Sequence, residues 1–124
     1  MIEQKWKYVK KLDDSNKIRD FLKRYNVKLP ESIIMCMEKN NGGRPSEPEF
    51  STDQSEGYVF KSLFSYNKKD LENIYLYYPE MFKDTSLFPI GMDSSGNFVC
   101  YDTEKQIMVL WMHETSRVEV INIR

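Results

Sequence analysis

The sequence contains few of the side chains on which most catalytic and metal-binding sites depend. Among 124 residues there are one histidine and two cysteines. A structural zinc site takes four ligands, mostly cysteine and histidine, so no metal site is predicted. Two cysteines are also too few for a disulfide framework. Cys36 and Cys100 each lie in an apolar run and are expected to be buried, reduced thiols; a reactive thiol would need an activating neighbour, and none is visible in the sequence.

Long hydrophobic runs are also missing. No stretch approaches the roughly 20 apolar residues that span a bilayer. The lysine-containing N-terminus is not followed by the apolar region of a secretory signal. We therefore expect a cytoplasmic protein without a membrane contact. Hydrophobic residues make up 40% of the chain and aromatic residues 14%, which is enough for one compact core, so a single domain over residues 1–124 is expected.

Groups for acid–base chemistry are scarce. His113 lies beside Glu114, but neither a nucleophile nor an orienting acid is visible around them, so a structural or surface histidine is expected. Asp93 and Asp102 flank one short hairpin and could lie near each other, which is not enough to indicate paired-carboxylate catalysis. No catalytic, cofactor-binding or metal-binding residue is predicted, and an enzyme that uses His113 and Glu114 remains only a third alternative.

Two glycine-containing segments are expected to be turns. Gly42 and Gly43 follow a helical pattern and lack the Lys-Ser/Thr pair of a phosphate-binding loop, so they are expected to close a helix in the left-handed conformation. Residues 93–97, "DSSGN", lack the repeated ligands of a calcium loop and predict a tight hairpin turn.

Charge is unevenly distributed, although the net charge is only −1. Residues 1–28 carry nine Lys/Arg and four Asp/Glu, and we interpret these lysines as the solvated face of an amphipathic helix. Residues 29–60 carry two Lys/Arg and six Asp/Glu. Within them lies an acidic cluster of Glu47, Glu49, Asp53 and Glu56. Such a cluster repels phosphate and attracts basic partners, so direct binding of nucleic acid is not expected.

Apolar spacing predicts three helices. Residues 13–27 contain Ile18, Phe21, Leu22 and Tyr25 at helical spacing, with Asp14 or Ser15 as N-cap. Residues 29–41 predict a second helix that begins near Pro30. Its expected buried stripe and core fillers are Ile33, Ile34, Met35, Cys36 and Met37. A third helix is predicted over residues 67–78, with Asn67 as N-cap, Leu71, Ile74, Tyr75 and Tyr78 on one face, and Pro79 as its end.

The remaining pattern is typical of strands. "EFST" (49–52) could form a short edge strand, and residues 58–66 predict another strand. Four further runs, at 87–93, 97–102, 107–113 and 117–123, are separated by short turns and predict an antiparallel meander. The stretch "IMVLWM" (107–112) is expected to be covered on both faces, and "VEVINI" (118–123) to be half-exposed. The fold class is therefore α+β: a mostly antiparallel sheet ending in a four-strand meander, with about three helices packed on one side.

Several motifs, in their order, resemble the SUKH superfamily, which includes the fungal cell-wall assembly regulators and many bacterial immunity proteins. A Leu-Pro pair starts the second helix, Asn-Gly-Gly ends it, and "FPIGMDSSGNFVCYD" (88–102) precedes a strand with Trp111, His113 and Glu114. The residues that carry the family pattern are Leu29, Pro30, Asn41, Gly42, Gly43, Phe88, Pro89, Ile90, Gly91, Asp93, Gly96, Asp102 and Trp111. The N-terminal "KWKYVKKL" lies outside the general pattern. Trp6 within it is expected to pack onto the domain, and Trp111 to lie in the core.

The resemblance implies a non-catalytic protein-binding module without a cofactor. Bacterial members commonly neutralise polymorphic toxins, often nucleases, whose surfaces are basic. This chain is expected to be an immunity protein that binds such a toxin as a monomer or weak dimer, through Glu47, Glu49, Asp53 and Glu56, with Tyr77 as an apolar anchor. The alternative is a regulatory or scaffolding domain like the fungal relatives. The sequence leaves open which toxin is bound and which surface binds it.

Overall fold

The structure is a computed structural model that describes residues 1–122. Its helices are α1 (Lys17–Arg24), α2 (Glu31–Lys39) and α3 (Tyr78–Met81), with a short 3-10 helix, η1 (Ile74–Leu76), before α3. Its strands are β1 (Trp6–Lys7), β2 (Arg44–Pro45), β3 (Glu49–Phe50), β4 (Tyr58–Leu63), β5 (Leu87–Asp93), β6 (Phe98–Asp102), β7 (Ile107–Trp111) and β8 (Val118–Val120). The predicted α+β class is confirmed.

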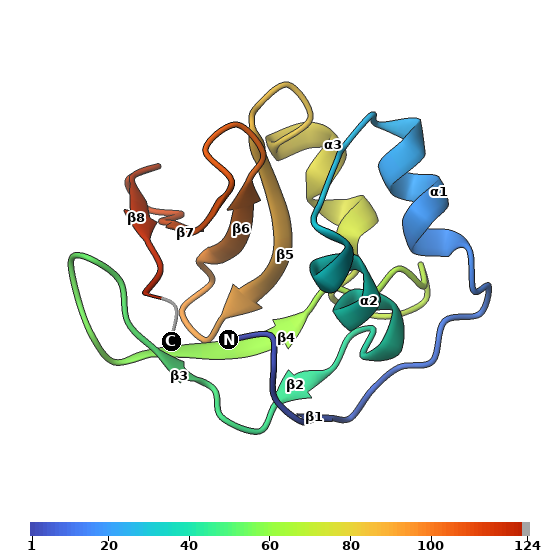
Figure 1. Cartoon of the computed structure of the whole chain (residues 1–124), viewed down its shortest axis with the longest axis horizontal. Coiled ribbons are helices and arrows are strands. Elements are labelled where there is room, and N and C mark those ends of the chain that lie inside the picture. The colour runs from blue at the N-terminus through green and yellow to red at the C-terminus, as the bar shows by residue number, and fades with distance from the viewer. Residues whose placement is uncertain (123–124) are drawn as a thin grey trace.

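A curled antiparallel sheet makes up most of the strand content. Its order is β3-β4-β5-β6-β7-β8, so each strand lies beside its neighbour in the chain, and β5 to β8 form the predicted meander. The expected edge strand is confirmed as β3, which pairs with β4. The three helices lie on one side of the curled sheet (Figure 1). Strands β1 and β2 form a separate two-stranded sheet below α2.

The two ends of the six-stranded sheet meet. Thr52, shortly after β3, forms an antiparallel bridge with Ile121, which follows β8. The amide of Asn122 donates to the carbonyl oxygen of Ser51 at 2.9 Å. This seam, residues 51–53 against 120–122, covers the edges that an open sheet leaves exposed.

A carboxylate is buried inside the seam. The Glu119 side chain is 8% exposed and accepts hydrogen bonds from Thr52 Oγ1 at 2.7 Å and from the Tyr58 hydroxyl at 2.8 Å. Strand β8 alternates as predicted, but Glu119 faces inward while Val118 and Val120 are exposed. The two hydroxyl groups donate hydrogen bonds to the buried carboxylate, which offsets the free-energy cost of removing it from water.

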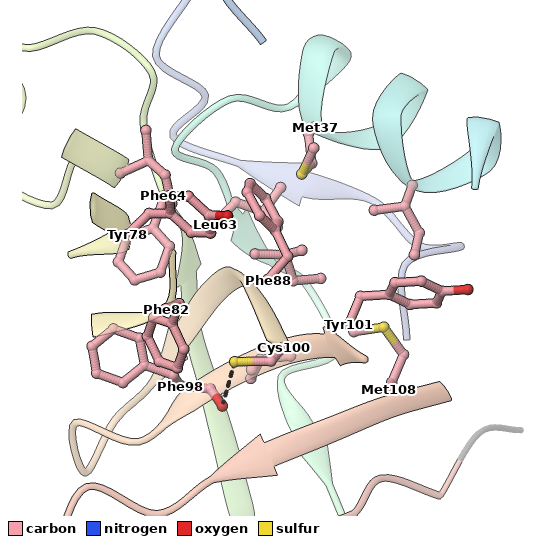
Figure 2. Close-up of a cluster of buried hydrophobic side chains, with 14 of the residues drawn as sticks. Met37, Leu63, Phe64, Tyr78, Phe82, Phe88, Phe98, Cys100, Tyr101 and Met108 are labelled. Carbon is pink, nitrogen blue, oxygen red and sulfur yellow. Dashed lines mark hydrogen bonds between the residues drawn. The ribbon is translucent and has the colours of Figure 1, made fainter. Parts of the chain in front are cut away.

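Aromatic side chains fill the space between the sheet and the helices (Figure 2). The ring of Phe98 in β6 lies 5.8 Å from that of Phe64, 5.4 Å from Phe82 and 5.7 Å from Trp111. These edge-on and tilted contacts add to the hydrophobic burial. The predicted burial of β7 on both faces is also confirmed, because its residues 108–110 are all buried.

The helix predicted over residues 67–78 is wrong. Within this range only η1 and Tyr78, the first residue of α3, are helical. Leu71, expected on the buried face, is 90% exposed. Asn67 does not cap a helix, since its side chain binds the backbone of Lys11 and Asp13. Pro79 occupies the first turn of α3, where a missing amide hydrogen costs nothing.

Two interpretations of the N-terminal half also need correction. The first helix begins only at Lys17, and residues 1–16 are not helical. The four lysines before it therefore lie on an extended segment and not on a helix face: Lys5, Lys7, Lys10 and Lys11. Neither Asp14 nor Ser15 caps α1, whose N-cap residue is Asn16. In α2, the predicted stripe is confirmed for three residues, Ile33, Ile34 and Met37, whereas Met35 is 59% exposed and Cys36 only partly buried.

The glycine pair after α2 has two separate roles. Gly42 adopts φ +66°, the left-handed conformation that closes a helix. Gly43 is needed for space: a Cβ there would lie 2.8 Å from the carbonyl oxygen of Asn40 and 3.3 Å from Val9. The N-terminal segment therefore packs directly against this turn. Gly91 in β5 is crowded in the same way, since a Cβ would lie 2.5 Å from the carbonyl oxygen of Ser62.

Candidate protein-binding site

A hollow of about 800 Å³ opens between the N-terminal residues and the segment after β2. Four glutamates line it: Glu3, Glu47, Glu49 and Glu56. No lysine or arginine side chain of the described residues lines it. The carboxylates form no ion pair within residues 1–122, so their negative charge is left for an external group. We refer to this feature as the acidic hollow.

The wall of the acidic hollow is held by Gln4. Its Nε2 donates to the carbonyl oxygen of Met1 at 2.6 Å, and its Oε1 accepts the amide of Glu47 at 2.6 Å. The amide of Ser46 donates to the carbonyl oxygen of Lys5 at 2.8 Å. Glu3 is distant in sequence from Glu47, and these contacts, together with the β1–β2 pairing, bring the two carboxylates to one opening.

Aromatic surface lies among the carboxylates. Phe50 is partly buried, lines the hollow, and stacks on Tyr58 with ring centroids 5.5 Å apart. Buried Phe60 also lines it and contacts the ring of Trp6 at 5.7 Å, so the expected packing of Trp6 onto the domain is confirmed. The hollow thus offers both negative charge and an apolar contact, the two elements from which tight protein interfaces are built.

Two of the predicted binding residues lie elsewhere. Asp53 does not line the hollow; its Oδ1 accepts the amide of Val120 at 3.0 Å, so it belongs to the seam of the sheet. Tyr77 is partly buried, with its ring 5.1 Å from Phe64 and 5.3 Å from Phe98, which makes it a packing residue and not a free anchor. Glu3 and Phe50 were missed, because nothing local marks a residue that meets its partners across the fold.

A second hollow of about 570 Å³ lies on the other side of the same N-terminal residues. It shares Glu3 and Gln4 with the acidic hollow. The rest of its lining is Ile2, Asn40 and part of α2, including the exposed Met35 and the partly buried Cys36. Burial raises the pKa of the Cys36 thiol above its usual value, which disfavours the reactive thiolate. The thiol also contacts the carbonyl oxygen of Ile2 at 3.8 Å.

The carboxylates of the family motif are used for turns. Asp93 Oδ1 accepts the amides of Ser95 and Asn97 at 2.9 and 2.8 Å, and Gly96 adopts φ +86°, so the predicted hairpin turn is confirmed. Asp102 Oδ1 accepts the amides of the two residues after Thr103. The two aspartates lie at opposite ends of the β5–β6 hairpin, since Asp102 pairs with Leu87, so the suggestion that they lie close together is wrong.

His113 lies at the surface beside the same turn. Its Nδ1 is 2.9 Å from Asn97 Oδ1, and its Nε2 is 3.9 Å from the exposed carboxylate of Glu114. The side chain is 42% exposed, and no cysteine, serine or threonine hydroxyl is bonded to it among residues 1–122. The ring therefore contacts a turn residue and solvent.

The other motif residues position the backbone and the core. Pro30 precedes α2 and accepts, through its carbonyl oxygen, the amides of Ile33 and Ile34. Asn41 is 1% exposed; its side chain donates to the carbonyl oxygen of Lys10 and accepts the amide of Tyr66. The remaining apolar positions lie in or against the core: Leu29, Phe88, Pro89, Ile90 and Trp111.

Residues 1–122 contain neither a metal-binding cluster nor a membrane-spanning helix. No group of three or more His, Cys, Asp or Glu side chains is placed to hold a metal ion. No helix in this part of the chain combines the length and apolar character that crossing a membrane requires.

Comparison with known protein families gives a match. The family model SUKH_6, described as SMI1-KNR4 cell-wall, matches residues 15–122. No curated protein and no solved structure matches the chain. The matched range contains α1 and every later element, and it leaves out β1 and the lysine-rich segment around it.

Proposed function

The chain belongs to the SUKH_6 family of SMI1-KNR4 cell-wall proteins, and from this premise we propose that it is a non-catalytic immunity protein that binds a toxin. The observation that carries the proposal is the acidic hollow, whose four glutamates have no cationic partner among residues 1–122. Its partner is a protein with a basic surface, and a nuclease domain fits because it must attract phosphate.

The mechanism is occlusion. Unpaired carboxylates around an opening attract a basic surface over a distance of about 10 Å at moderate salt and speed the encounter. Charge alone sets the rate of association more than its strength, so the stable complex needs an apolar contact, which Phe50 supplies. A toxin held in this way cannot present its basic surface to nucleic acid. No step of bond making or breaking is required of the immunity protein.

The decisive experiment is rescue of a toxin-expressing cell. The probe is a toxin gene found beside this gene, co-expressed with the wild-type protein or with the double variant Glu47→Lys/Glu56→Lys. We expect the wild type to protect. In purified form, the variant should associate about tenfold more slowly at low salt, because two attractive contacts become repulsive.

The matched control reverses two exposed glutamates outside the hollow, Glu80 and Glu104, neither of which forms an ion pair within residues 1–122. Glu80→Lys/Glu104→Lys changes the total charge by the same amount and should associate like the wild type. Equal slowing of both double variants would show that net charge, not the hollow, is responsible. Failure of the wild type to protect or to form a complex would refute the immunity function itself.

A regulatory or scaffolding role is the second candidate, favoured by the cell-wall description of the family that matches. It predicts several cellular partners and no protection against a neighbouring toxin. Affinity capture of the tagged protein, carried out in cells with and without the toxin gene, separates the two. Recovery of the toxin as the dominant partner supports immunity, whereas recovery of the same housekeeping proteins in both cells supports scaffolding.

A further inference from the structure

The extended segment of residues 5–11, here called the strap, carries a row of exposed cations. Lys5, Lys7, Lys10 and Lys11 are all exposed, as is Arg44 on the neighbouring strand. None of these five side chains forms an ion pair with residues 1–122. The strap precedes residues 15–122, the range that matches the family model, so its surface is not a feature of the family pattern.

The backbone of the strap is held in place by hydrogen bonds to two buried asparagines, Asn41 and Asn67. The amide of Lys10 donates to the carbonyl oxygen of Asn41 at 2.8 Å, and Asn41 Nδ2 donates back to the carbonyl oxygen of Lys10 at 2.8 Å. Asn67 Nδ2 donates to the carbonyl oxygen of Lys11 at 2.8 Å. Both asparagine side chains are 1% exposed. The strap therefore presents its cations from a rigid backbone, which lowers the entropic cost of binding.

Two local features of the strap oppose folding. Lys7 and Arg44 lie directly opposite each other in the β1–β2 pair, and like charges in that position repel. The next residue, Tyr8, adopts φ +55°, a conformation that costs a bulky side chain energy. Its side chain is nevertheless 73% exposed, so contacts within residues 1–122 leave most of it uncovered. Unfavourable local choices of this kind concentrate at binding sites.

We infer that the strap is a second docking surface, and that its occupant is an acidic polypeptide segment with apolar side chains. Acidic groups relieve the repulsion between Lys7 and Arg44. An aliphatic or aromatic side chain of the same segment covers Tyr8 and the neighbouring Val9, which is 42% exposed. A phosphodiester chain makes little use of the aliphatic Val9, whereas a peptide can cover it with an apolar side chain.

Binding can be measured by fluorescence anisotropy on the full-length protein. The probe is a fluorescein-labelled peptide of Glu-Glu-Leu repeats, with a labelled oligothymidylate of similar length in a parallel titration. We expect the peptide to bind, to weaken as salt is raised, and to bind about threefold more weakly to Lys7→Glu and to Tyr8→Gly. Lys83→Glu, which reverses an exposed lysine outside the strap, should leave peptide affinity unchanged.

Thermal unfolding of the same variants separates a binding role from a structural one. Lys7→Glu converts the repulsive pair into an attractive one, and Tyr8→Gly relieves the backbone strain, so both should melt at a higher temperature than the wild type while binding the peptide less well. Arg44→Gln removes the repulsion without adding a negative charge. It should also raise the melting temperature and weaken peptide binding. A purely structural role for these residues predicts lower melting temperatures instead.

Each remaining outcome overturns the inference. Absence of peptide binding at low salt would do so, as would equal weakening in Lys83→Glu. Tighter binding of the oligothymidylate would assign the strap to nucleic acid. If light scattering shows a dimer that Lys7→Glu dissociates, the occupant is the acidic hollow of a second copy. Loss of toxin protection is not a readout here, so the proposed function can fail while this inference stands.

Discussion

The hydroxyl group of Tyr66 is buried in the core and has no hydrogen-bond partner among residues 1–122. Its ring is 1% exposed and contacts Phe21 edge-on, with centroids 5.5 Å apart. Burial raises the pKa of this hydroxyl far above its usual value, because the ionised form has no water around it. The pKa values of Tyr58, Tyr75 and Tyr78 are raised as well, in each case mainly by burial.

These shifts predict alkaline sensitivity. A tyrosine whose pKa is higher in the folded state than its unfolded value of 10.0 contributes stability that is complete below that value and is lost as the pH rises through the folded pKa. Melting temperature should therefore be level near neutral pH and fall steeply above about pH 10. Calorimetry across this range tests the prediction. A melting temperature that does not change up to about pH 11 would contradict it.

Tyr66→Phe isolates one contribution. The substitution removes an unpaired buried hydroxyl and keeps the ring, so at neutral pH we expect the free energy of unfolding to stay level or to rise by up to about 1 kcal/mol. The fall of the melting temperature at alkaline pH should become less steep. Tyr8→Phe is the control, since Tyr8 is 73% exposed and its substitution should leave the alkaline curve unchanged. Destabilisation by Tyr66→Phe at neutral pH would show that the hydroxyl has a partner.

Among the elements, β8 depends on the seam for its orientation. Glu119 is the buried residue of this strand, and its two hydrogen bonds come from Thr52 and Tyr58, on the far end of the sheet. Without the seam, this carboxylate would lie in the interior with no donor, which costs several kcal/mol. The position of β8 and the closure of the sheet therefore stabilise each other.

The coupling can be measured by a double-mutant cycle. Glu119→Leu removes the acceptor and leaves both hydroxyl groups unpaired, and we expect it to cost about 2–3 kcal/mol in the free energy of unfolding. The same substitution in a Thr52→Val/Tyr58→Phe background should cost less by about 1 kcal/mol or more. Urea unfolding provides the measurement, and Glu104→Leu on the surface is the control. Strict additivity of the changes would mean that the three side chains do not form one unit.

Over the whole molecule, two surfaces of opposite charge adjoin the N-terminal segment. Glu3 belongs to the acidic hollow, and the strap begins two residues later at Lys5. Their charges nearly cancel in the net charge of −1, which gives no sign of either surface. The strap also covers the glycine turn after α2, because the nearest atoms to a Cβ at Gly42 belong to the Lys10 side chain. The N-terminal residues therefore serve both the fold and its outer surface.

Removal of residues 1–13 should consequently destabilise the remaining chain. Asn41 and Asn67 would lose their bonds to the strap, and Phe60 would lose the ring of Trp6. Four hydrogen bonds to Asn41 and Asn67 and one aromatic contact together predict a loss of about 3 kcal/mol or more. Trp111 fluorescence in urea reports unfolding in both forms, and Trp6→Ala alone should cost less. Equal stability of the shortened and full-length chains would show that the strap only rests on the surface.

Local patterns were sufficient for the helical stripe of α2 and for the β5–β8 meander. Alternation, apolar runs and turn residues such as Asp93 and Gly96 act over a few positions, so they can be recognised in the sequence. The same reasoning failed over residues 67–78. The helical spacing there is real, but Asn67 gains more from bonding to the backbone of the strap than from capping a helix, and that partner lies 56 residues away in the sequence.

The sequence by itself determined the α+β class, the family and the scarcity of catalytic side chains, because these follow from composition and from short-range order. Only the tertiary structure decided which acids share one hollow, why Glu119 can be buried, and that Lys7 faces Arg44. Each of these depends on segments far apart in the chain that meet when the sheet curls and the N-terminal residues fold over it. These long-range contacts depend on the packing of the whole core, which no short stretch of sequence encodes.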